Sequence, residues 1–429
     1  MQPPTANPGN QPMNTGNQPY PPMQPPVPLV PPVAPAPLAP PVPLVPPTPP
    51  APLHHLNLQQ GQPQLRHLAY PQQWIQHQQQ MTGAFPPLRH AQIRNAQAFQ
   101  QHTSTFPPLR NAQIIHTQAF PPQIQPYQHP HFKYPIIPGI APRTYLPQGT
   151  SLVLEGGGTR GFYSAGVFEA FMDAGIMFPY IVAVSAGAAN VLTYIAGQRG
   201  RNRIIVEHLV KDPRYLNTAN LLRGKSLFDY DFIFHQVPKD LLFFDQNRFN
   251  QTQTRLLTGT LDCREGRTIW YEKDALAPDY TPTIASCSIP FVSKMVRYDN
   301  RDLYDGGILD PIPIDKSVQD GNTFHVIIMT QNPGYLKQAS RIGSLAWLKY
   351  HRKYPHLVWA LQERHNAYNR QVQRAEQLER EGRALIIRPL DTIDVSRVEQ
   401  SPDKLLALYD EGHREGTAAV AKLRQRFAF

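Results

Sequence analysis

The uneven distribution of proline and acidic residues constrains the fold of this chain more than any other feature. Of its 48 prolines, 36 lie at or before Pro147, and no Asp or Glu occurs before Glu155. A segment this rich in Pro, Gln and His cannot bury enough apolar surface to offset the entropy lost on ordering it. We therefore expect residues 1–147 to form a disordered, low-complexity tail and residues 148–429 to form the folded domain.

Two patterns in the tail concern contact with protein partners. Residues 21–50 are a Pro/Val/Leu/Ala tract that favours polyproline II, because each Pro fixes its own backbone and removes a donor. A 15-residue segment at 85–99, FPPLRHAQIRNAQAF, is duplicated at 106–120 as FPPLRNAQIIHTQAF. The duplication is either drifting low-complexity sequence or a pair of docking sites that fold on a partner.

The net charge of +10 also divides unevenly along the chain. The tail contributes +6, which leaves +4 for the remainder, so the folded part is only mildly basic. This balance suits weak attraction to an anionic membrane surface, and the absence of a Lys/Arg run argues against a nucleic-acid partner. The six basic residues of the tail are Arg66, Arg89, Arg94, Arg110, Lys133 and Arg143.

Cysteine content and hydropathy bear on where the protein works. Cys263 and Cys287 are too few for a disulfide framework and lack metal-ligand spacing, which favours a reducing compartment. The chain begins without a basic segment followed by an apolar run, and no stretch approaches about 18 apolar residues. We expect a cytoplasmic protein or one peripheral to the membrane, and delivery into another cell stays open.

From residue 150 onwards, apolar runs alternate with helical patterns. This order predicts an α/β fold with a mostly parallel central sheet. The region divides into a core at 150–330 and a helical C-terminal part at 340–429. Strands are predicted at 151–155, 179–184, 281–286, 325–330 and 384–389, and helices at 161–175, 186–197, 340–381 and 403–426.

The segment AVSAG at 183–187 places Ser185 between a predicted strand and a predicted helix. A nucleophile at such a turn is held clear of the sheet, and small residues two positions away on either side let the backbone turn tightly. Ala183 stands where Gly is usual in this GxSxG pattern. A serine that merely caps the following helix would give the same letters.

A second pattern, EGGGTRG at 155–161, also follows a strand. The glycines remove side chains that would keep a ligand from the backbone, so Gly157 and Gly158 can direct N–H groups at a developing oxyanion. A dinucleotide site is disfavoured because the acidic residue expected about 20 positions later is missing. Arg160 is unusual at a helix start, and it pairs with a carboxylate, contacts a substrate phosphate or braces the loop.

The third pattern, YDGGILDPIPI at 304–314, contains Asp305 before two glycines. Asp310, five residues later, competes with it for any carboxylate role. Alone, Asp-Gly-Gly indicates only a turn. Together, the three patterns meet three requirements of acyl transfer, which are charge stabilisation, nucleophilic attack and proton removal.

These residues resemble those of the patatin-like phospholipases, most closely the bacterial branch. The resemblance rests on EGGGTRG with GFYSAGVFEAF, on VSAGAAN at 184–190, on ASCSIPFVSKMV at 285–296 and on LYDGGILDPIPI at 303–314. It implies a three-layer α/β/α hydrolase with a Ser–Asp dyad, no metal and no organic cofactor. The implied roles are nucleophile for Ser185, proton acceptor for Asp305, oxyanion hole for Gly156, Gly157 and Gly158, and supporting motif for Arg160, Gly161, Gly187, Gly306 and Gly307.

Two further groups of residues are given no chemical role. The histidines after Asp305 open a strand or lie in charged helical stretches, so a Ser, Asp, His order is disfavoured. These histidines are His325, His351, His356, His365 and His413. The aromatic stretches at 228–234 and 241–249 are more often core than a lipid-facing lip.

We therefore predict a lipid acyl hydrolase of phospholipase A or lysophospholipase type, whose substrate is a phospholipid or another lipid ester. The alternative is a catalytically idle adaptor that acts through the Pro-rich N-terminal tail.

Overall fold

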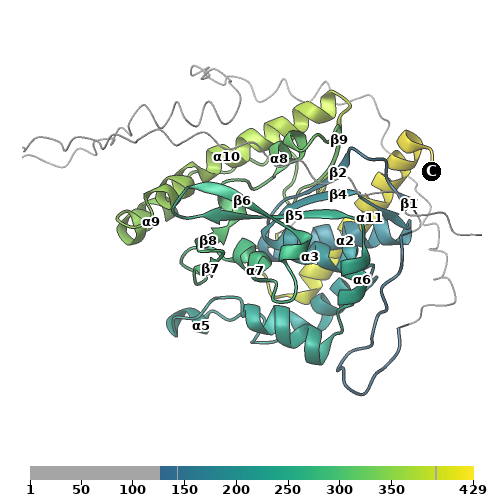
Figure 1. The fold of residues 1–429 in the computed structure, drawn as a ribbon, viewed down its shortest axis with the longest axis horizontal. Helices are drawn as coiled ribbons and strands as arrows, with labels where there is room; N and C mark the ends of the chain where they lie inside the picture. The colour runs from purple at the N-terminus through teal and green to yellow at the C-terminus, as the bar shows by residue number, and fades with distance from the viewer. Residues whose placement is uncertain (1–125, 143, 392–393) are drawn as a thin grey trace, which may run out of the picture. The chain divides into compact units, whose positions relative to one another are not determined.

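The computed structural model describes residues 126–142, 144–391 and 394–429 (Figure 1). The expected disorder of residues 1–125, the proline tract at 21–50 and the duplication at 85–99 and 106–120 lie outside the described residues.

A mixed eight-stranded sheet forms the centre of the described structure (Figure 1). Its order is β10-β9-β2-β4-β5-β8-β7, with β6 paired to β5. The pairs from β10 to β5 are parallel, whereas β5–β6, β5–β8 and β8–β7 are antiparallel. The strands are β2 (Thr150–Leu154), β4 (Tyr180–Val184), β5 (Arg255–Asp262), β6 (Arg267–Glu272), β7 (Val296–Tyr298), β8 (Arg301–Asp305), β9 (Phe324–Ile328) and β10 (Ala384–Ile387).

A separate two-stranded parallel sheet joins β1 (Thr144–Tyr145) to β3 (Ile176–Met177). The α-helices are α2 (Phe162–Asp173), α3 (Ser185–Ile195), α4 (Arg201–Ile204), α5 (Ala219–Leu222), α6 (Gln246–Gln251), α7 (Thr281–Cys287), α8 (Ile314–Gln319), α9 (Ile342–Tyr350), α10 (Pro355–Arg380) and α11 (Pro402–Phe427). In the part of the chain that the structure describes, none of these helices has the length and apolar character needed to span a membrane.

Helices cover both faces of the sheet because alternate strand residues point to opposite sides. Val153, Val182 and Ile327 face α10, where they pack with Tyr368 and Val372. Their chain neighbours on the same strands, such as Leu152, Ile181 and Val326, pack in the cluster that includes α2, α3 and α11. Figure 1 shows α8 and α10 on one side of the sheet and α2, α3 and α11 on the other. The predicted three-layer α/β/α fold is confirmed.

Most of the predicted elements are present, and two are wrong. Residues 281–286 form the start of helix α7 rather than a strand. Pro282 lies in the first turn of this helix, where its missing N–H removes no helical hydrogen bond. The helix expected at 340–381 is two helices, α9 and α10, because Pro355 begins a new helix. Strands β5, β6, β7 and β8, which form the antiparallel pairs of the sheet, were not predicted.

The folded part of the chain begins earlier than the expected boundary at residue 148. Ile136, Ile137 and Leu146 are buried, and the Gln198 side chain donates to the Ile137 carbonyl at 2.6 Å. Three apolar side chains in a proline-containing stretch therefore suffice to pack residues before 148 onto the domain.

The last helix, α11, packs tightly along α2. A Cβ atom on Gly412 would lie 2.1 Å from the carbonyl oxygen of Tyr163, and one on Gly166 would lie 1.9 Å from that of Tyr409. Glycine at both positions lets the two backbones approach. The C-terminal part is thus built into the same core as the first βα unit.

Candidate active site

Ser185 lies at a sharp turn where β4 ends and α3 begins. Its φ is 55°, a left-handed conformation that costs a residue with a side chain on the order of 1 kcal/mol or more. The Ser185 N–H donates to Ser286 Oγ at 2.8 Å, and Ser286 donates to the Gly259 carbonyl at 2.7 Å. These two bonds hold the strained backbone, and the sequence patterns assigned Ser286 no role, although it lies in the ASCSIPFVSKMV segment.

Ala183 does not prevent this turn. It is a fully buried residue of β4, paired in register with Leu154 and Thr258. The position at which two backbone segments come close together is Gly187, where a Cβ would lie 2.9 Å from the carbonyl oxygen of Glu155. The strand–turn–helix geometry expected of the GxSxG pattern is therefore present with Ala at its first position.

Strand register brings Asp305 to Ser185. Val184 pairs with Gly259 across β4 and β5, and the next residue of β5, Thr260, pairs with Asp305 on β8. Gly306 allows this approach, since a Cβ there would lie 2.4 Å from the Gly259 carbonyl oxygen. Residues 120 positions apart in the chain thus meet at one edge of the sheet.

Asp305 is 1% exposed, and its surroundings favour a base that works near neutral pH. Burial raises the pKa of its carboxyl to about 6, while Arg364, the Ser185 hydroxyl and the Gly307 N–H oppose the rise. The Gly307 N–H donates to the carboxylate at 2.7 Å. The Ser185 hydroxyl is near enough to interact with this carboxylate, although the two form no hydrogen bond of standard geometry.

The glycine loop that follows β2 lies directly against Ser185. A Cβ on Gly156 would lie 2.7 Å from Ser185 Cβ, so only glycine fits there. The Gly156 N–H donates to the Pro311 carbonyl at 3.3 Å. The N–H groups of Gly157 and Gly158 have no acceptor among the described residues, which leaves these two amides available to an oxyanion.

The residue after the glycines ties this loop to a distant part of the chain. The Thr159 N–H donates to the Arg397 carbonyl at 3.0 Å, and its hydroxyl donates to the Ser396 carbonyl at 3.2 Å. The Glu399 N–H donates back to Thr159 Oγ1 at 3.0 Å. We call residues 396–399 the clamp segment. It precedes α11 and fixes the position of the glycine loop.

Arg160 and Gly161 complete this motif in different ways. With the Gln331 amide oxygen turned toward the guanidinium, Arg160 donates to it at 2.6 and 2.9 Å. Arg160 forms no ion pair with a carboxylate among the described residues, so the predicted salt bridge is absent. Gly161 packs against Ala186 and Asn190 of α3, and its carbonyl accepts from the Asn190 side chain at 2.9 Å.

The residues considered as alternatives for the acid–base role, Asp310 and the histidines, lie outside the Ser185 cavity. Asp310 accepts hydrogen bonds from Thr268 and Gln371 and does not line the Ser185 cavity. His325 is buried against Ser151 and Ser317, and burial lowers its pKa to about 4. No histidine of the described ranges lines the cavity.

A cavity opens at Ser185 and contains an unexpected group of cations. Ser185, Asp305 and the three glycines form one part of its wall. Lys337, Arg364 and Arg397 also line it, and each is partly buried. The sequence patterns placed Arg364 in a predicted helix at 340–381 and gave Lys337 and Arg397 no role, because the approach of all three cations depends on long-range packing.

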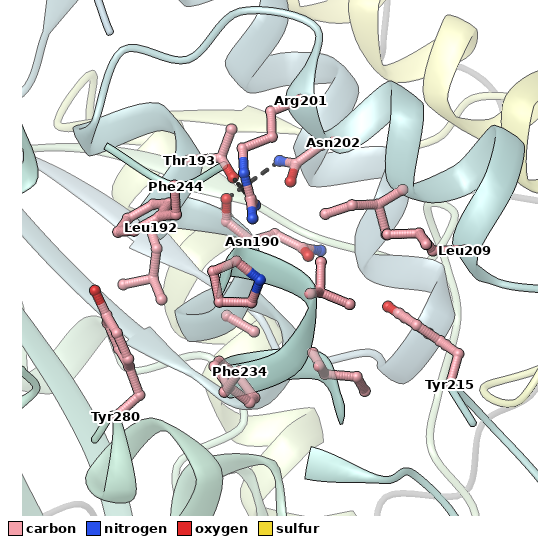
Figure 2. A pocket seen from close by; sticks show the side chains of 15 residues that line it. Asn190, Leu192, Thr193, Arg201, Asn202, Leu209, Tyr215, Phe234, Phe244 and Tyr280 are labelled. Carbon is pink, nitrogen blue, oxygen red and sulfur yellow. Dashed lines mark hydrogen bonds between the residues drawn. The ribbon is translucent and has the colours of Figure 1, made fainter. Parts of the chain in front are cut away.

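A second and larger cavity lies beside α3 (Figure 2). Figure 2 shows the rings of Phe244 and Tyr280 on one side, Tyr215 on the other, and Arg201 at one end. Arg201 donates to the carbonyls of Leu242 and Phe243, and burial lowers its pKa to about 10. The walls are mainly apolar.

The aromatic stretches at 228–234 and 241–249 form core and cavity wall. Phe232, Leu242 and Phe249 are fully buried, and Phe234 and Phe244 line the second cavity. The interpretation as core is supported for the buried residues, and none of the five is an exposed side chain.

Two family models match parts of the chain. Residues 152–317 match the patatin-like phospholipase model, and residues 354–428 match a domain of unknown function, DUF6363. The cavity cations Arg364 and Arg397 lie in the second region, and Lys337 lies between the two.

Curated relatives match at moderate identity. The uncharacterized protein YjjU of Escherichia coli (strain K12) is 30% identical over 209 residues, which is 44% of this chain and 55% of that protein. An uncharacterized NTE family protein of Mycobacterium tuberculosis (strain ATCC 25618 / H37Rv) is 27% identical over 188 residues, 41% of this chain and 48% of that protein. The chain spans about half the length of the curated relatives it matches.

Among solved structures, VipD from Legionella pneumophila aligns with a TM-score of 0.34 and 14% identity, over 66% of this chain and 67% of that one.

Proposed function

We propose, since residues 152–317 form a patatin-like phospholipase domain, that this chain hydrolyses carboxylic esters of lipids with Ser185 as nucleophile and Asp305 as base. A domain of this family supports lipid ester hydrolysis in general. The observation that carries the finer assignment is the shared cavity, which contains the Ser185 hydroxyl, the Asp305 carboxylate and two amides that have no acceptor in the described part of the chain.

The proposed reaction has two halves. Asp305 accepts the Ser185 proton as Oγ attacks the ester carbonyl, and Gly157 and Gly158 donate to the resulting oxyanion. The alkoxide of the substrate leaves with the proton from Asp305, and an acyl-Ser185 ester remains. Water then attacks this ester, Asp305 accepts the water proton and returns it to Ser185, and the fatty acid departs.

Electrostatics supports this division of roles. An Asp with a pKa of about 6 is ionised at neutral pH and is a stronger base than an exposed Asp. Ser185 is also the first residue of α3, so the positive end of the helix favours negative charge beside its hydroxyl.

The second cavity is suited to an acyl chain. Ala189, which lines it, lies four residues after Ser185 on α3, and residues at this spacing share a helix face. Four residues of helix rise about 6 Å, a short distance for a fatty acyl chain to cross. An apolar cavity beside the nucleophile fits a phospholipase A or lysophospholipase activity.

Contact with a membrane surface is supported by α9. Leu345, Trp347 and Leu348 are 56%, 46% and 70% exposed on this helix. Arg341, Lys349, Arg352 and Lys353 are exposed around them. Apolar side chains framed by cations suit the interface of an anionic bilayer.

Fluorophosphonate labelling tests the proposed function. Wild-type protein should be labelled and Ser185→Ala should not, whereas Ser164→Ala, which removes another buried serine, should retain labelling. Asp305→Asn should lower kcat for a short soluble ester by about a hundredfold or more. If the wild type is not labelled and hydrolyses no ester, the idle adaptor becomes the better description.

A further inference from the structure

The cations of the Ser185 cavity are a feature that ester hydrolysis alone does not require. Lys337 precedes α9, Arg364 lies on α10 and Arg397 lies in the clamp segment. All three line the cavity that contains Ser185, although their segments are separate in the chain. Arg160 adds a fourth cation near this group: burial lowers its pKa, and the neighbouring charge of Arg397 lowers it further.

Few anions balance these charges. Glu155 and Asp305 are the carboxylates that line the cavity, and burial raises the pKa of both. The described residues contain no carboxylate within 4.0 Å of the charged nitrogens of Lys337, Arg364 or Arg397. Burial and the two arginines lower the pKa of Lys337 to about 7, as expected where positive charge exceeds negative charge.

These cations also have unused donors. Arg364 donates only one hydrogen bond, from Nε to the Gly307 carbonyl at 3.4 Å, among the described residues. The Lys337 ammonium lies 4.9 Å from the centre of the Tyr368 ring. Arg160 Nε is buried without a partner among the described residues. Guanidinium and ammonium donors directed at one concave space match the oxygens of a phosphate group.

We propose that Lys337, Arg364 and Arg397 form a phosphate-binding subsite beside Ser185, so that the preferred substrate carries a phosphate close to the ester that is cleaved. This inference rests on the proposed function and names its substrate class. An acylated glycerol 3-phosphate fits, because the acyl ester at its middle carbon lies next to the carbon that carries the phosphate. The subsite also assigns a role to residues 354–428, which complete the site with cations.

The turnover experiment compares two lipids with the same acyl chains, phosphatidic acid and diacylglycerol, in micelles of an uncharged detergent. Arg397→Gln and Lys337→Gln should each lower the ratio of kcat/KM for phosphatidic acid to kcat/KM for diacylglycerol by about tenfold. Arg397→Lys should restore part of the ratio. Arg370→Gln removes an exposed cation from the same helix as Arg364 and should leave the ratio unchanged. An unchanged ratio in both Arg397→Gln and Lys337→Gln would overturn the proposal.

A binding experiment tests the phosphate subsite in a protein that cannot catalyse the reaction. Glycerol 3-phosphate should raise the unfolding temperature of the full-length Ser185→Ala protein, glycerol should not, and the added Arg397→Gln change should abolish the shift. A shift with glycerol 3-phosphate supports the subsite even if the labelling experiment refutes the hydrolase. A shift with inorganic phosphate alone would identify free phosphate as the ligand and overturn the assignment to substrate.

Discussion

Asp305 shows how position sets the chemistry of a single residue. Its carboxyl lies at the end of a strand with almost no contact with water, and burial raises its pKa to about 6 from an ordinary 3.8. The native state therefore keeps a proton between pH 4 and 6 that the unfolded chain has already lost. As the pH rises through this range, the free energy of unfolding falls.

Asp305→Asn should remove this loss of stability. The difference in unfolding free energy between the variant and the wild type should grow in favour of the variant by about 2 kcal/mol from pH 4 to pH 7. Urea unfolding at pH 4, 5, 6 and 7 measures the difference. A difference that stays constant with pH would show that the carboxyl titrates alike in the folded and unfolded chains.

The residues of the candidate site could be predicted where they lie in a short, recognisable sequence motif. Ser185 and the three glycines follow predicted strands, Asp305 precedes two glycines in a short motif, and all of them line one cavity. Ser286 lies in the ASCSIPFVSKMV segment, where no pattern assigned it a role, and Lys337, Arg364 and Arg397 lie in no motif. Ser286 contacts Ser185 across 101 positions, and the three cations reach the site through helix packing that short-range patterns do not encode.

At the scale of elements, α9 exposes three large apolar side chains, those of Leu345, Trp347 and Leu348. The double variant Leu345→Ser/Leu348→Ser should lower hydrolysis of anionic phospholipid vesicles by about fivefold and leave a short soluble ester unaffected, because only the vesicle requires surface binding. Leu222→Ser removes a 93% exposed leucine from α5 and is the matched control. Equal rates on vesicles for both variants and the wild type would exclude α9 as the contact.

The predicted elements were correct where a long apolar run or a helical period was present, as for β2, β4, β9, α2 and α11. Residues 281–286 were mistaken for a strand because a segment of six residues, TPTIAS, carries no decisive hydrophobic period. Their burial against the sheet as α7 is a tertiary effect. β5 was missed because its apolar run is interrupted by Gly259, the residue whose carbonyl contacts both Gly306 and Ser286.

At the scale of the whole molecule, the structure indicates where the chain can be shortened. Deletion of residues 1–125 should leave turnover of a short soluble ester unchanged, because every residue that lines either cavity is retained. Deletion of residues 1–140 also removes Ile136 and Ile137 and should lower the free energy of unfolding by about 2–4 kcal/mol. Ester turnover and thermal unfolding of both truncated proteins measure the two effects. Equal stability of the two would show that the packed segment contributes nothing.

The hydrogen bonds between Thr159 and residues 396–399 have a consequence for how turnover is controlled. The amides proposed to receive the oxyanion precede Thr159 directly, so any shift of that remote stretch displaces them too. Under the proposed function, the reaction rate depends on the position of residues 396–399, which lie more than 200 positions along the chain from Ser185. A proteolytic cut in residues 396–399, or a molecule bound to them, would stop the proposed reaction without altering any reacting side chain.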